Sequence, residues 1–137
     1  MKKLIFILLA AVILAGCQSK PVNGEMVTAA GGSYKNVSAD ELHTMLKKKD
    51  FVFVNVHIPF AGNVPNTDLS IPYDQVEHNL SQLPADKNTK IVLYCRSGRM
   101  SQMAAEELVS LGYTNVWNLT GGTLDWERAG FEMEKQT

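Results

Sequence analysis

The chain has 137 residues and a formal net charge of −1, from 13 basic and 14 acidic residues. This near-neutral balance lacks the basic excess that is typical of nucleic-acid-binding proteins, so we expect no nucleic-acid partner. Its two cysteines and three histidines form no cluster at metal-ligand spacing, so we expect no metal and no cofactor. One hundred or so residues follow a targeting segment, which is enough for one domain with a single core.

Residues 1–16 have the pattern of a signal peptide. Lys2 and Lys3 precede twelve apolar residues (4–15), a run too short for a comfortable membrane span but typical of a signal. The run ends in Leu-Ala-Gly-Cys at positions 14–17, which resembles the lipobox of bacterial lipoproteins. That resemblance implies cleavage before Cys17 and lipid attachment to its sulfur, whereas the alternative is an ordinary secretory signal. We therefore expect an exported protein, lipid-anchored to a bacterial membrane, with its domain on the extracytoplasmic side.

Residues 17–32 contain Pro21, Asn23 and three glycines and have no sustained apolar period, which predicts a flexible tether. Removal of residues 1–16 leaves 11 basic and 14 acidic residues, a net charge of −3. No basic patch in the sequence indicates a second membrane contact. The lysines at 47–49 are interpreted as the solvated end of a helix, with a docking patch as the alternative.

The folded domain is predicted over residues 33–134, with strands and helices that alternate. A first strand (34–37) precedes a helix from about 39 to 48, and Ser38 with Glu41 forms a capping box at its start. A buried strand (51–56), a proline-containing loop, a brief edge strand (69–72) and one or two helical turns (73–83) follow. Such alternation predicts an α/β domain of three layers, with a mainly parallel five-stranded sheet flanked by helices.

The second half of the chain contains its most informative stretch. The apolar run 91–94 predicts a central strand, and apolar residues at helical spacing from Met100 through Met103, Ala104 and Leu108 predict the next helix. Cys95 lies between them, at the carboxyl end of a strand, where ligands bind in such sheets. A last strand (115–119), the pair Gly121–Gly122 and a final helix (123–129) with a core Trp126 complete the domain.

The loop after Cys95 favours a reactive thiol over an inert one. Loop amides, the helix N-terminus and the cations of Arg96 and Arg99 would all stabilise the nucleophilic thiolate and an anionic substrate beside it. Free cysteines are more commonly buried and inert, which is the alternative. Polar Ser97 and Gly98 with two arginines make a poor core but a good anion site, so we expect Cys95 to be catalytic.

At these residues the chain resembles the rhodanese-like sulfurtransferases. The family's active-site loop commonly reads Cys-Arg-Ser-Gly-x-x-Ser, which residues 95–101 match. Residues 111–116 (Leu-Gly-Tyr-x-Asn-Val) and 119–126 (Leu-x-Gly-Gly-x-x-x-Trp) resemble the family's closing segment. The resemblance covers about residues 33–134.

What the resemblance implies is sulfur transfer through a persulfide on Cys95, from a small anionic donor such as thiosulfate to a thiol or cyanide acceptor. The donor and the outer sulfur would be bound by Arg96, Ser97, Gly98, Arg99 and Met100. With Cys17 acylated and Cys95 catalytic, no intramolecular disulfide is available. A non-enzymatic module that binds an anion or a thiol, or that relays persulfide to one partner protein, is the alternative. Cysteine phosphatases are disfavoured, because their arginine six residues after the cysteine is Ser101 here.

The family pattern is broken before the loop. Where relatives usually read Asp-Val-Arg, this chain has Asn55-Val56-His57, and an acid and a base are therefore replaced together. The concerted change is consistent with loss of a structural ion pair without an unpaired partner. His57 is interpreted as a structural histidine at a strand end, with a role in proton transfer as the alternative.

Overall fold

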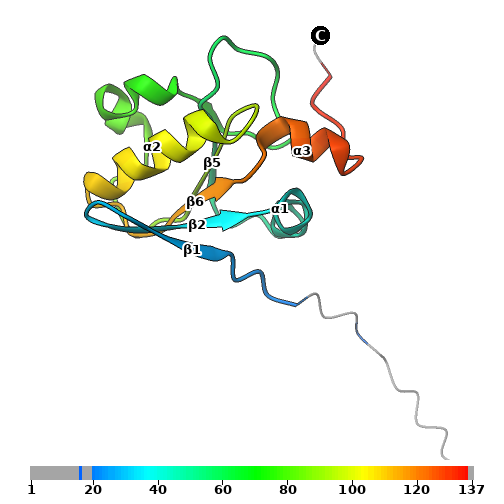
Figure 1. Cartoon of the computed structure of the whole chain (residues 1–137), viewed down its shortest axis with the longest axis horizontal. Helices are drawn as coiled ribbons and strands as arrows, with labels where there is room; N and C mark the ends of the chain where they lie inside the picture. Colours follow the sequence, from blue (N-terminus) through cyan, green and yellow to red (C-terminus); the bar gives the residue numbers. More distant parts are fainter. Residues whose placement is uncertain (1–15, 17–19, 136–137) are drawn as a thin grey trace, which may run out of the picture.

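The computed structural model describes Gly16 and residues 20–135 (Figure 1). The predicted signal segment, except Gly16, and the predicted lipidation residue Cys17 lie outside the described residues. No helix within the described part of the chain is long and apolar enough to cross a membrane.

Six strands form one sheet in the order β1-β2-β6-β5-β3-β4, in which β1 and β2 are antiparallel and all other neighbours are parallel. The fold class is therefore α/β with a mostly parallel sheet, as predicted. The elements are β1 (Glu25–Ala29), β2 (Gly32–Val37), α1 (Ala39–Leu46), β3 (Val52–Asn55), β4 (Leu69–Ser70), the 3-10 helices η1 (Tyr73–Gln75) and η2 (Glu77–Gln82), β5 (Ile91–Tyr94), α2 (Arg99–Ser110), β6 (Val116–Leu119) and α3 (Gly122–Arg128).

The strand count differs from the five predicted, because β1 lies where the sequence indicated a flexible tether. Residues 25–29 pair with 32–36 in a hairpin whose turn contains Gly31, at a φ of 87°. The sequence pattern of this strand is weak, because β1 lies at the edge of the sheet and is mostly exposed, with Met26 60% accessible. The sheet therefore includes residues that lie before the predicted domain start at residue 33.

Helices cover both faces of the sheet and make three layers. Figure 1 shows α1 and α2 on opposite sides of the strands. Alternation along β5 sends Ile91 and Leu93 into a core cluster under α2, and Val92 and Tyr94 into a second cluster that includes residues of α1 and α3. All four residues are buried, as expected for a central strand of a parallel sheet.

The buried face of α2 differs slightly from the predicted one. Its buried residues are Ser101, Ala104, Ala105, Leu108 and Val109, whereas Met103 is 48% exposed. The predicted helix face was wrong at Met103, because small alanines and a serine allow the helix to pack closely on the sheet. The cap of α1 is confirmed: the Ser38 hydroxyl accepts the Glu41 amide at 3.2 Å, and the Glu41 carboxylate accepts the Ser38 amide at 2.8 Å.

Replacement of Ser38 by Ala should lower the free energy of unfolding by about 1 kcal/mol, because the helix loses the acceptor for a first-turn amide. Urea denaturation followed by circular dichroism measures the change. Ser81→Ala, at an exposed serine in a 3-10 helix, is the control and should shift stability by less than about 0.5 kcal/mol. Equal effects of the two substitutions would contradict a specific role for the cap.

Candidate active site

Cys95 is the first residue after β5, at the carboxyl end of a central strand. It is 1% exposed and belongs to the core cluster on the α2 side of the sheet. Burial alone is also typical of inert cysteines. What distinguishes this thiol is the polar backbone around its sulfur.

The Cys95 sulfur accepts hydrogen bonds from the loop that follows it. The Gly98 amide donates to Sγ at 3.0 Å, and the Ser101 hydroxyl lies 3.4 Å from the same sulfur. The hydroxyl also lies 3.2 Å from the Gly98 carbonyl oxygen, so its one proton serves either acceptor. The sequence analysis placed Ser101 in the loop motif and assigned it no contact with the sulfur.

Gly98 is the N-cap of α2 and supplies no capping side chain. Its φ of 96° is in the left-handed region, and the chain there turns back so that its amide faces the sulfur. The amides of the first helical turn begin at Arg99 and have no side-chain cap. This end of α2 therefore presents N–H donors and the positive end of the helix dipole next to a thiol.

Backbone hydrogen bonds from the start of α3 hold the loop that follows Cys95. The Thr123 amide donates to the Cys95 carbonyl oxygen at 3.0 Å, and the Leu124 amide donates to that of Arg96 at 3.1 Å. A Cβ on Gly122 would lie 2.4 Å from the Cys95 oxygen and 2.5 Å from the Arg96 oxygen. Only glycine allows this approach, so the Cys95 and Arg96 carbonyls are tied to α3 at the start of the loop whose Gly98 amide donates to the sulfur.

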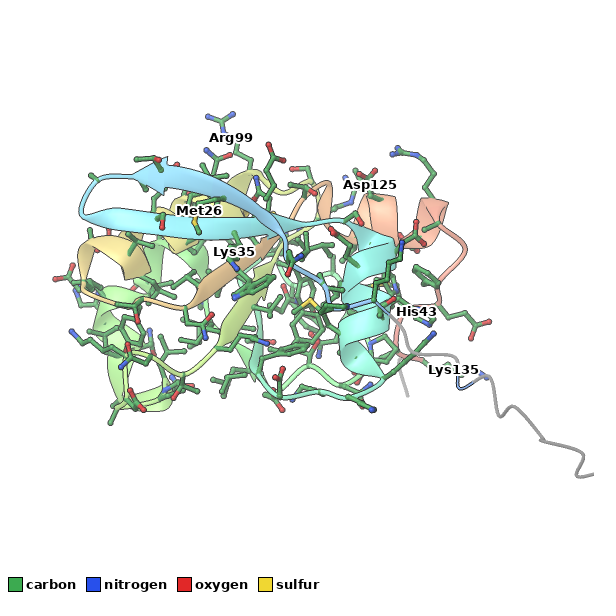
Figure 2. The ribbon with its side chains drawn as sticks, turned by 90° about the horizontal axis from the view of Figure 1, so that it is seen from below. Met26, Lys35, His43, Arg99, Asp125 and Lys135 are labelled. Atoms are coloured by element: carbon green, nitrogen blue, oxygen red, sulfur yellow. The ribbon has the colours of Figure 1, made fainter. Side chains whose placement is uncertain are left out.

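The five residues predicted to bind the donor are not equivalent in the structure. Arg96, Ser97 and Arg99 are exposed. Figure 2 shows the Arg99 side chain directed away from the body of the protein. Met100 packs partly against the core cluster on the α2 side, and Gly98 alone among the five donates to the sulfur.

His57 lies beside Arg96 at the same edge of the sheet. Asn55 pairs with Tyr94 in the parallel register, and the Val56 amide continues the ladder to the Tyr94 carbonyl oxygen at 2.9 Å. Two residues further on, the strand directions bring His57 next to Arg96. Partial burial, and secondarily the Arg96 charge, lower the pKa of His57. The histidine is therefore neutral at neutral pH.

Asn55 stands where the family resemblance implies an acid. It is 2% exposed, and both its side-chain oxygen and its side-chain nitrogen form hydrogen bonds. Its amide donates to the Gly62 carbonyl oxygen and to Asn63 Oδ1, both at 3.0 Å, and its Oδ1 accepts the His57 amide at 3.0 Å. A neutral network thus fixes the loop after β3, consistent with the expected loss of an ion pair at this position. The change leaves no buried charge behind.

Tyr94 extends this network on the other face of β5. Its hydroxyl accepts the Val64 amide at 3.0 Å and lies 2.7 Å from the Thr67 hydroxyl. Burial raises the pKa of Tyr94 to about 12, so the phenol stays protonated at any physiological pH. Together, Asn55 and Tyr94 order the irregular segment 57–68 beside the cysteine loop.

Comparisons with known proteins agree with this geometry. A model of the rhodanese-like domain family matches residues 38–129. A sulfurtransferase from Allochromatium vinosum is 34% identical over 88 residues, which cover 62% of this chain and 79% of that protein. A solved rhodanese-like domain protein from Staphylococcus aureus is 30% identical with a TM-score of 0.62, covering 75% of this chain and 99% of that one.

A third relative, a tRNA uridine(34) hydroxylase from Erwinia tasmaniensis, is 32% identical over 108 residues, or 74% of this chain. The chain spans only 30% of that protein's length, so the likeness concerns one part of it. The chain belongs to the rhodanese-like domain family. A model of prokaryotic membrane lipoprotein lipid attachment sites also matches residues 1–18, so the family domain follows a lipoprotein signal.

Replacement of Gly122 by Ala should lower the free energy of unfolding by about 2–3 kcal/mol, because the methyl group collides with the Cys95 and Arg96 carbonyls. The displaced loop should also change the rate at which iodoacetamide alkylates Cys95. Gly130→Ala is the matched control: its φ of 88° is also positive, but nothing lies within 4 Å of the added Cβ. If both variants behave alike, backbone strain rather than close contact explains the effect.

Proposed function

We propose that this protein is a membrane-anchored sulfurtransferase that carries sulfane sulfur as a persulfide on Cys95. The observation that carries the proposal is the hydrogen bond of 3.0 Å from the Gly98 amide to the Cys95 sulfur, at the uncapped N-terminus of α2. Backbone N–H groups stabilise a thiolate without competing as nucleophiles. The match to the rhodanese-like family and the sulfurtransferase from Allochromatium vinosum support the same chemistry.

In the first half-reaction, the Cys95 thiolate attacks the sulfane sulfur of a small anionic donor such as thiosulfate. A new sulfur–sulfur bond forms, the donor's own sulfur–sulfur bond breaks, and sulfite leaves with the electron pair. Cys95 then carries one additional sulfur, whose negative charge the amides of residues 96–100 stabilise. Arg96, at the rim, neutralises the approaching donor.

In the second half-reaction, an acceptor thiolate or cyanide attacks the outer sulfur of the persulfide. The bond to Cys95 breaks, and its electron pair returns to Sγ as thiolate. No external oxidant or reductant is consumed, because the donor supplies sulfur at the oxidation level that the acceptor receives. The Ser101 hydroxyl donates a hydrogen bond to the regenerated thiolate, at the 3.4 Å separation observed.

We further propose that Cys17 carries the lipid anchor and that the domain lies on the extracytoplasmic side of the membrane. The match to lipid attachment sites over residues 1–18 supports this assignment. Several acyl chains on one residue anchor stably, whereas a single chain binds reversibly. Donor and acceptor would then be encountered outside the cytoplasm.

Replacement of Cys95 by Ser should abolish sulfur transfer from thiosulfate to cyanide, because a serine hydroxyl is a weak nucleophile and cannot form a persulfide. Initial rates at varied concentrations of both substrates measure the effect. The wild-type protein should give ping-pong kinetics, as expected for a covalent carrier. Turnover by a Cys95→Ser protein whose circular dichroism matches wild type would refute the mechanism. A wild-type protein that binds thiosulfate without turnover would favour the binding-module alternative.

Replacement of Arg96 by Ala should raise the KM for thiosulfate roughly tenfold, the effect of losing one charge-assisted hydrogen bond. Arg99→Ala should change it less, because the Arg99 side chain points away from the protein (Figure 2). The two variants remove the same charge from the same loop and so control for net charge. An unchanged KM in Arg96→Ala would show that this arginine does not contact the donor.

A further inference from the structure

Residues 20–22 contact the domain, although the composition of residues 17–32 predicts a flexible tether there. Val22 is partly buried and packs against the core cluster on the α1 side. Lys20, Pro21 and Val22 line a hollow of about 460 Å³ together with the end of α1. Within the predicted sixteen-residue tether, residues 20–22 therefore lie against the domain, and Lys20 is three residues from Cys17 in the sequence. Three residues span at most roughly 11 Å even when fully extended.

The hollow beside this segment is strongly basic. Four lysines line it, against a single acidic residue, Asp50. Lys90 pairs with Asp50 at 3.0 Å. The other three are exposed and form no ion pair within the described chain; they are Lys20, Lys47 and Lys48. We call these four lysines and Asp50 the lysine hollow.

The sequence indicated only part of this patch, the lysine run after the first helix, because its cations come from three separate segments. Lys20 precedes β1, Lys47 and Lys48 directly follow α1, and Lys90 precedes β5. Cations at a helix C-terminus are also explained by the helix dipole, which is how the lysine run was interpreted. Folding places Lys20 against that helix end, so the charge is concentrated where the chain leaves for Cys17.

We propose that the lysine hollow binds the phosphates of anionic phospholipids in the membrane that holds the acyl chains of Cys17. This inference rests on the proposed acylation of Cys17. A tether of roughly 11 Å keeps the hollow within about one Debye length of the headgroups. Each lysine near an anionic surface strengthens binding on the order of fivefold, so three act together with the lipid as a second anchor.

The contact fixes the direction in which the cysteine loop faces. Lys90 immediately precedes β5 and Cys95 immediately follows it. The two residues are separated by the length of the strand, roughly 16 Å. Figure 2 agrees: Arg99, at the start of α2, lies at one edge of the molecule, and α1 runs toward the opposite edge. The cysteine loop therefore opens away from the bilayer, toward donors and thiol acceptors in the aqueous phase.

The test uses the full lipidated protein, whose intact mass first establishes the acyl group on Cys17. The protein is placed in vesicles of phosphatidylcholine, with or without one-third phosphatidylglycerol. A membrane-impermeant amine reagent then labels lysines, and peptide mass spectrometry gives the rate at each position. In the anionic vesicles, Lys20, Lys47, Lys48 and Lys90 should be labelled at least about fivefold more slowly than in phosphatidylcholine, and 1 M salt should remove the difference.

Two variants separate the hollow from a general effect of membrane charge. The triple variant Lys20→Gln, Lys47→Gln, Lys48→Gln should lose the protection of Lys90. Arg128→Gln removes an exposed cation from α3, outside the hollow, and should keep it. Equal labelling of acylated wild type in both vesicles would overturn the inference and leave the anchor intact. Equal protection by inorganic phosphate with phosphatidylcholine vesicles would assign the hollow to a soluble anion instead. Protein without an acyl group would remove the anchor and this inference together.

Discussion

The site depends on the close contact between the Gly122 backbone and the carbonyl oxygens of Cys95 and Arg96. A side chain at position 122 would occupy the space that these oxygens take. With both carbonyls accepting hydrogen bonds from α3 amides, the first two peptide units of the loop are held in place. One peptide unit further on, Gly98 turns in the left-handed region and its amide donates to the sulfur at 3.0 Å. The chemistry assigned to Cys95 is thus set by a turn that lies more than twenty residues downstream.

The second constraint is the neutral network around Asn55. It anchors the segment after β3 with hydrogen bonds to Gly62, Asn63 and His57 in place of an ion pair. Buried ion pairs lose much of their Coulomb energy to desolvation, so an amide that satisfies the same backbone is an adequate substitute. A neutral His57 beside Arg96 also leaves the arginine as the nearby charge for an anionic donor. The departure from the family pattern is therefore local and compensated.

Features that depend on near neighbours were predictable from the sequence. The capping box at Ser38, the buried strand before Cys95 and the helix after Gly98 all follow from residue types within a few positions. Features that depend on contacts between segments far apart in the sequence could not be predicted. β1 is a strand because β2 pairs with it, and Met103 is exposed because alanines set the helix phase. The Ser101 contact with the sulfur and the lysine hollow likewise require the folded chain.

These features describe a domain with a cysteine loop at the carboxyl end of its central strand, and we propose that a lipid on Cys17 holds it at a membrane. The central claim is that Cys95 carries sulfur covalently. The intact mass of the wild-type protein after incubation with thiosulfate and removal of excess donor tests this directly. A gain of one sulfur atom, mapped to Cys95 and reversed by cyanide, is the predicted result. A mass that stays unchanged with thiosulfate and with other sulfane donors would contradict the account.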